Sequence, residues 1–183
     1  GSILSPSCAC AASNQAVGLG ADLIKVGRAD VVIAGGADEL SVLSSATFDT
    51  VRAGCRGHED APHTRPAPFD ASRDGVVVGE GAAIVILEEL EHARARGATI
   101  LVEILGYGES CDATHMSSPE PEGMEAAMKR ALENAGLSPA EIDYVCAHAT
   151  GTEVGDAAEA EATRRIFGRS EEHTSELQSQ FRI

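Results

Sequence analysis

The chain alternates amphipathic segments that end at glycine with short runs of apolar, β-branched residues. Apolar residues recur at intervals of three to four within residues 16–26, and this spacing predicts a helix that ends at Gly27. Residues 29–36 (ADVVIAGG) follow at once and predict a strand buried on both faces, in a parallel or mixed sheet with helices on each side. A helix, a short turn and a buried strand in this order indicate the α/β class.

The same alternation continues toward the C-terminus. Further strands are predicted at residues 82–87, 100–106 and 144–148, and further helices at 41–53, 88–96, 123–135 and 155–167. Residues 54–75 interrupt the pattern with a long connection rich in charge, proline and glycine. Connections of that length are usually functional or lie across a surface, and the alternating Arg and Asp residues favour local ion pairs.

The charge of the chain excludes several classes of partner. Its 183 residues carry 14 Lys and Arg against 29 Asp and Glu, which gives a net charge of −15. An acidic surface repels phosphate, so we expect neither nucleic-acid nor membrane binding. Hydrophobic residues make up 43% of the chain, enough for a globular core, and no apolar run is long enough to span a bilayer.

The five cysteines do not form a disulfide or zinc pattern. They are odd in number, scattered, and contain no C-x-x-C pair. We therefore expect no disulfide framework and no metal site, and the sequence has no recognisable signal peptide. A cytoplasmic location is the expectation.

One cysteine stands where a nucleophile is expected. Cys10 precedes the helix predicted for residues 16–26, and the unpaired N–H groups at a helix start favour a thiolate. The other explanation for Cys8 and Cys10 is that both are small buried core residues.

His148 is the candidate partner of Cys10, because it ends the predicted strand 144–148 and sites in α/β sheets collect at such ends. A thiol beside an imidazole is suited to acyl transfer. Papain-like proteases have a similar Cys-to-His spacing, but their Cys is followed by Trp or Tyr, whereas Cys10 is followed by residues 11–13 (AAS).

Seven separated stretches resemble the β-ketoacyl-[acyl-carrier-protein] synthases of the thiolase-like superfamily, specifically the synthase II type. These stretches, in the family's order, are residues 7–13, 34–38, 65–70, 73–75, 79–82, 110–116 and 147–152. The resemblance implies an α/β fold of the thiolase-like layered α/β/α type, incomplete in this chain. Residues 1–98 would be the end of the N-terminal ketosynthase half, and residues 99–168 the start of the C-terminal half.

The resemblance implies a role for each of two catalytic residues. Cys10 would attack the thioester of an acyl-carrier protein and hold the acyl chain. His148 would be one of two histidines that assist decarboxylation of malonyl-carrier protein and stabilise the enolate. Ala149 stands where the family usually has Gly, and the second histidine, a preceding Lys and a Gly-Phe-Gly-Gly loop have no match. The resemblance therefore implies an interior fragment that is inactive alone.

Four further residues are binding candidates on the same resemblance. Thr150 and Thr152 would bind the phosphopantetheine arm, although turn capping is the alternative explanation. Phe48 would lie beside the acyl pocket, unless it is an ordinary core residue. Arg52 would contact the acidic carrier protein. Asp156 and Glu159 would be acidic residues behind the His148 loop with a structural role.

The family implies partners and rivals as well. An acyl-carrier protein and a second copy of the full-length chain are the expected partners, and no cofactor is expected beyond the carrier's phosphopantetheine. One alternative function is a non-catalytic, chain-length-setting subunit of a ketosynthase heterodimer, which Cys10 argues against because such subunits typically lack the nucleophilic Cys. The other is a thiolase, which the 148–152 motif disfavours because thiolases have a different His arrangement.

The last segment differs in character from the rest. Residues 169–179 (RSEEHTSELQS) resemble the translation of a sequencing-adapter oligonucleotide, so residues 169–183 are predicted to be a non-native tail. An ordinary disordered tail is the alternative.

Overall fold

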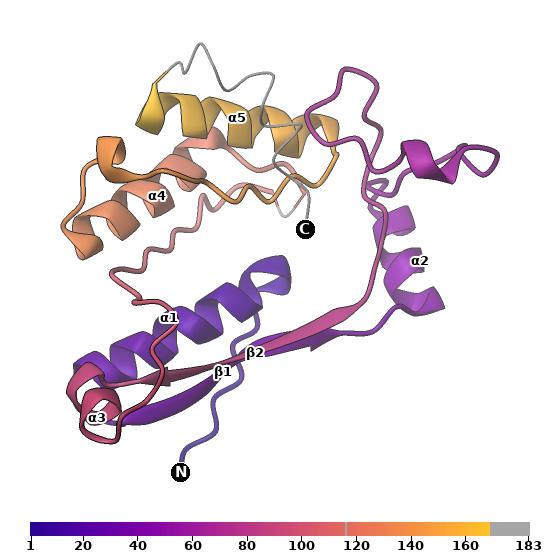
Figure 1. Ribbon diagram of the computed structural model, residues 1–183. Coiled ribbons are helices and arrows are strands. Elements are labelled where there is room, and N and C mark those ends of the chain that lie inside the picture. Colours follow the sequence, from indigo (N-terminus) through magenta and orange to yellow (C-terminus); the bar gives the residue numbers. More distant parts are fainter. Residues whose placement is uncertain (116, 169–183) are drawn as a thin grey trace.

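The computed structural model describes residues 1–115 and 117–168 (Figure 1). The predicted tail at 169–183 and Met116 of the 110–116 stretch lie outside the described residues. In chain order the elements are 3₁₀ turn η1 (Ala9–Ala11), α1 (Ala12–Lys25), β1 (Val31–Asp38), α2 (Val42–Thr50), η2 (Pro62–Thr64), β2 (Gly81–Glu88), α3 (Leu90–Ala95), α4 (Pro121–Ala135), η3 (Pro139–Glu141) and α5 (Glu153–Phe167).

The N-terminal part is a helix packed on a pair of strands. β1 and β2 pair antiparallel from Val31 opposite Glu88 to Asp38 opposite Gly81, and α1 lies along one face of the pair (Figure 1). Gly20 of α1 faces the side chains of Val32 and Leu87, so the helix backbone approaches the sheet closely. The α/β class predicted from this helix and strand is confirmed.

The predicted burial of the first strand on both faces is wrong. Its partner β2 runs antiparallel, which a mixed sheet allows, but Ile33 of β1 is 73% exposed. The physical reason is that, in the described part of the chain, α1 covers one face of the pair and no element covers the other.

Two other predicted strands are also wrong. Residues 100–106 and 144–148 carry strand-like apolar patterns, but neither forms a ladder within residues 1–115 and 117–168, where β1 and β2 make the only sheet. Leu101 is 88% exposed. A strand forms only when a partner strand accepts and donates its backbone hydrogen bonds. Within the described residues, neither run has such a partner strand.

The predicted helices are confirmed because their end signals are local. Ser41 and Ser44 form a reciprocal capping box at the start of α2. α4 begins with Pro121 and ends at Ala135, just before Gly136, whose φ of 69° is left-handed. α4 and α5 lie side by side above the α1 and β1–β2 layer in Figure 1.

The buried interior is small. Among the described residues, the buried apolar side chains are alanines on β1, α3 and α5: Ala34, Ala93, Ala158 and Ala162. Asp156 of α5 is the most deeply buried larger side chain, at 1% exposure. Among the helices described, none has the length and apolarity needed to cross a membrane.

Candidate functional site

Cys10 lies in η1, immediately before the first turn of α1. Its neighbour Ala9 has a φ of 45°, a left-handed conformation that is strained for a residue with a side chain. Cys10 is exposed, so the alternative of a buried core cysteine is wrong. The position at a helix start, with an accessible sulfur, is as predicted. Its role as nucleophile stays a prediction.

The backbone around His148 is held by a carboxylate from α5. The N–H groups of His148 and Ala149 donate to the two oxygens of Glu159, at 2.6 and 2.9 Å. Ala149 adopts a left-handed φ of 50°, so the chain turns sharply just after the histidine. The His148 side chain is exposed. Glu159 therefore fixes the turn from which this imidazole projects.

Asp156 joins the turn to a distant part of the chain. Its carboxylate accepts the backbone N–H of Phe69 at 2.6 Å and that of Gly151 at 3.0 Å. Arg73 approaches the same carboxylate to 3.6 Å. The predicted structural role for Asp156 has this physical form: a buried charge satisfied by two amides and a guanidinium.

The two threonine hydroxyls lie next to each other. The Oγ1 atoms of Thr150 and Thr152 are 2.9 Å apart, and Thr152 also accepts the N–H of Gly155 at 3.1 Å as the N-cap of α5. The capping alternative thus describes Thr152. Binding of phosphopantetheine by this pair stays a prediction.

Phe48 and Arg52 lie at the end of α2. Phe48 is half-buried, and its carbonyl accepts the N–H of Ala53 at 2.9 Å. Arg52 is exposed, with a left-handed φ of 56° that turns the chain out of the helix. The structure thus presents Arg52 to solvent, as contact with a second protein requires.

The structure brings the central stretch and the His148 turn together. Besides the Asp156 contacts, the N–H of Gly75 donates to the carbonyl of Gly151 at 2.9 Å, and Arg73 donates to the carbonyls of Thr152 and Glu153. No hydrogen bond in the described part of the chain joins Cys10 to His148. Their pairing stays a prediction.

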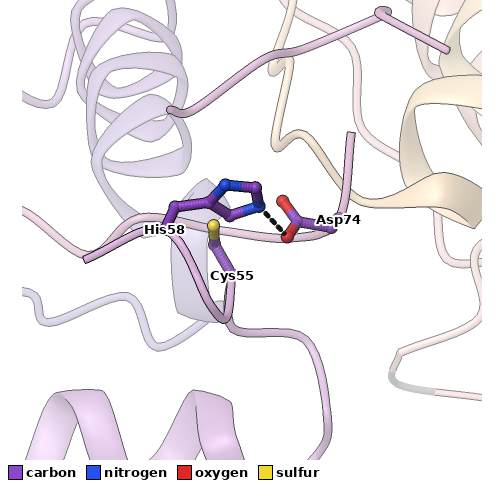
Figure 2. A group of neighbouring side chains, drawn as sticks. All are labelled: Cys55, His58 and Asp74. Atoms are coloured by element: carbon purple, nitrogen blue, oxygen red, sulfur yellow. Dashed lines mark hydrogen bonds and ion pairs between the residues drawn. The ribbon is translucent and has the colours of Figure 1, made fainter. Parts of the chain in front are cut away.

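One cluster was not expected from the sequence. Cys55, His58 and Asp74 converge in the long connection, and their donor atoms all lie within 4.8 Å of one another (Figure 2). Burial raises the pKa of the Cys55 thiol, and hydrogen bonds from Cys55 and His58 lower the pKa of Asp74. The short Cys-x-x-His spacing was the available signal, but Asp74 is remote in sequence.

Family models match nearly the whole chain. The model for "Beta-ketoacyl synthase, N-terminal domain" matches residues 1–93, and that for "Beta-ketoacyl synthase, C-terminal domain" matches residues 101–180.

Individual relatives agree with these matches. A putative mitochondrial 3-oxoacyl-[acyl-carrier-protein] synthase of Schizosaccharomyces pombe is 48% identical over 162 residues, which are 87% of this chain and 38% of that protein. The crystal structure of a β-ketoacyl synthase from Burkholderia phymatum superposes with a TM-score of 0.86 at 51% identity, covering 88% of this chain and 40% of that one.

A third match is a complex. It is a type II polyketide synthase acyl-carrier protein with its ketosynthase bound to the hexaketide, and the superposition has a TM-score of 0.83 at 35% identity over 87% of this chain and 40% of that one. The thiolase-like architecture expected from the sequence is thereby confirmed. The chain spans about two fifths of the length of these relatives.

Proposed function

The chain belongs to the β-ketoacyl synthase family, and on that premise we propose that it is part of a β-ketoacyl-[acyl-carrier-protein] synthase. Its reaction would be the decarboxylative condensation of an acyl-enzyme thioester with malonyl-carrier protein, in fatty acid or polyketide synthesis. The observation that carries this proposal is the exposed Cys10 sulfur at the start of α1, next to the left-handed Ala9.

The first half-reaction needs a thiolate that a thioester can reach. The N–H groups at the start of a helix, together with the helix dipole, stabilise a thiolate relative to a thiol. The Cys10 sulfur would attack the acyl thioester carbonyl, the acyl group would move to Cys10, and the carrier's pantetheine thiol would leave.

The second half-reaction needs an electrophilic donor for a developing enolate. Malonyl-carrier protein would lose carbon dioxide, and its carbanion would attack the acyl carbonyl on Cys10 and release the Cys10 thiolate. An imidazole N–H from His148 would stabilise the enolate oxygen. The two amides held by Glu159 support this role, because a fixed backbone limits where the imidazole can point.

Binding of the substrate and of the carrier protein is assigned to four residues. Thr150 and Thr152 present adjacent hydroxyls that would hydrogen-bond the phosphopantetheine arm. Phe48 would border the acyl chain. Arg52 supplies an exposed cation on a chain whose net charge is −15, and such a cation would attract an acidic carrier.

Partners, cofactor and location follow from the same premise. An acyl-carrier protein would deliver both substrates, a second copy of the full-length chain would complete a homodimer, and the condensation would need no cofactor beyond the carrier's phosphopantetheine. The five cysteines are all free, as a reducing compartment such as the cytoplasm would keep them.

The catalytic set is proposed to be incomplete in these 183 residues. The family's second histidine, Lys and Gly-Phe-Gly-Gly loop have no counterpart in the sequence. Large apolar side chains such as Ile33 and Leu101 are exposed, so the faces that would pack against the rest of such an enzyme are open. We expect no condensation by this chain alone.

The alternative is a chain-length-setting partner subunit. Two similar structures contain a ketosynthase together with a chain length factor. Cys10 favours the catalytic subunit, because the non-catalytic partners typically lack this nucleophile.

Acyl transfer to Cys10 tests the proposal directly. The full-length enzyme that contains these residues is incubated with an acyl-carrier-protein thioester, and the acylated peptide is mapped by mass spectrometry. We expect an adduct on Cys10 that Cys10→Ala abolishes and the matched control Cys8→Ala retains. An adduct confined to another cysteine, or none at Cys10, would overturn the nucleophile assignment.

A further inference from the structure

The long connection between α2 and β2 brings three different metal-binding groups to one place. The N–H of Cys55 donates to the carbonyl of Val76 at 2.9 Å, and Gly54 and Val76 form a parallel bridge. This pairing sets Cys55 beside Asp74, two residues before Val76. Gly57, with a left-handed φ of 74°, turns the chain so that His58 comes back toward both. Backbone contacts therefore build the cluster.

The spacing of the donor atoms fits a small tetrahedral ion. The Cys55 sulfur, a His58 ring nitrogen and an Asp74 oxygen lie within 4.8 Å of one another, and His58 Nε2 is 2.8 Å from Asp74 Oδ2 (Figure 2). Zinc binds such donors at about 2.0–2.3 Å, so tetrahedral ligands are about 3.3–3.8 Å apart. Small side-chain movements would bring these atoms to that separation.

The types of donor select the class of metal. A thiolate and an imidazole are ligands that suit zinc and neighbouring transition metals, whereas magnesium and calcium require oxygen donors almost exclusively. One thiolate and one carboxylate would balance the charge of a divalent ion.

Arg65 occupies the other side of Asp74. Its Nε lies 3.0 Å from Asp74 Oδ1, and its second amino group donates to the carbonyl of Ser72 at 3.0 Å. Oδ1 is therefore held by the guanidinium, while Oδ2 faces His58. A carboxylate anchored in this way is a well-oriented ligand, as outer-shell contacts commonly provide at metal sites.

We propose that Cys55, His58 and Asp74 form a binding site for Zn²⁺. His58 and Asp74 keep 29% and 32% of their side-chain area exposed, so an ion can enter from solvent and a water molecule can take the fourth position. The ion would close the long connection as a staple between the two ends of residues 55–74. None of the three residues is among those assigned to acyl transfer.

Cysteine coordinates zinc as a thiolate, so Cys55 would give up its thiol proton when the ion binds. Arg65, which forms an ion pair with Asp74, is a nearby positive charge that would repel the bound cation.

Metal titration of the intact chain tests the site. Zn²⁺ is titrated by calorimetry into the metal-free chain, and Co²⁺ is titrated separately while a thiolate-to-cobalt charge-transfer band is followed by absorption. We expect one tight equivalent of Zn²⁺ and a cobalt band. Cys55→Ser and His58→Ala are each expected to weaken Zn²⁺ binding more than tenfold and to remove or shift the band.

Matched controls separate this site from adventitious binding. Cys111→Ser and His63→Ala remove exposed residues of the same types outside the cluster, and both are expected to bind Zn²⁺ as the unchanged chain does. Circular dichroism of each variant reports whether it is folded. The proposal is overturned if Zn²⁺ does not bind, if folded Cys55→Ser and His58→Ala bind it undiminished, or if the controls weaken it equally.

Discussion

The carboxylate of Glu159 accepts the backbone N–H of His148 at 2.6 Å. The residue proposed to stabilise the enolate is therefore positioned by a helix, α5, through its backbone and not through its side chain. Among residues 1–115 and 117–168 the imidazole has no hydrogen-bond partner, while the turn that bears it is fixed. Glu159 in turn depends on α5, which is capped by Thr152 in the same turn.

Replacing Glu159 tests this arrangement. In Glu159→Gln one carboxylate oxygen becomes an NH₂ group, so one of the two amides loses its acceptor. We expect a loss of about 1 kcal/mol in the free energy of unfolding, below the usual range for hydrogen bonds to charged groups because Glu159 is partly exposed. In NMR spectra the His148 or Ala149 amide resonance should move upfield. Glu133→Gln, an exposed change on α4, should move neither.

Asp156 should be more sensitive to substitution. Asp156→Ala leaves the N–H groups of Phe69 and Gly151 without acceptors in a buried place, and we expect a loss of about 2–3 kcal/mol. Urea unfolding followed by circular dichroism measures it. Asp143→Ala removes an exposed carboxylate and should change the urea midpoint little; equal midpoints for the two variants would contradict the role given to Asp156.

Gly108 tests the close packing of the connecting segment on α4. A Cβ at Gly108 would collide with the backbone of α4 at Ala127 and Ala131, because the segment that contains Gly108 lies directly against this helix. Gly108→Ala should destabilise the protein by about 1–3 kcal/mol, as overpacking does. Gly79→Ala is the matched control, because a Cβ at Gly79 meets open space. Thermal unfolding of Gly108→Ala and Gly79→Ala measures the difference in stability between them.

The ion pair at the end of β2 predicts an acid-sensitive contribution to stability. Hydrogen bonds from Arg96 and His92 lower the pKa of Glu88 to about 2, against a value of 4.5 without them. Because the folded-state pKa is the lower one, this contribution is present above pH 4.5 and is lost as the pH falls toward 2.

Unfolding measured between these pH values checks this expectation. The stability of the unchanged chain should fall more steeply with acid than that of Glu88→Gln. Glu91→Gln, which removes a largely exposed partner of Arg94, should follow the unchanged chain. Parallel curves for the unchanged chain and Glu88→Gln would argue against the assignment.

The helices were predictable because their signals are local. Apolar periodicity, the serine cap of α2 and the glycine after α4 all lie within or beside the element that they specify. Residues 100–106 and 144–148 show the limit of such reasoning. Their composition favours strands, but a strand also needs a partner, and sequence pattern does not supply one.

The site was predictable in part for a related reason. Cys10 at a helix start follows from local pattern, and the turn at residues 147–152 was recognised by resemblance. The convergence of Cys55, His58 and Asp74 depends on the bridge between Gly54 and Val76, which joins segments far apart in sequence. The hydrogen bond from the Phe69 N–H to the Asp156 carboxylate also joins segments far apart in sequence.

Phe69 lies within the segment matched by the N-terminal family model, and Asp156 and Gly151 lie within the segment matched by the C-terminal one. One buried carboxylate thus bonds to amides from both segments. The boundary between the two matched segments therefore does not separate two independently packed units. A protease cut between residues 96 and 100 should accordingly leave two polypeptides that remain bound to each other until denaturant parts them.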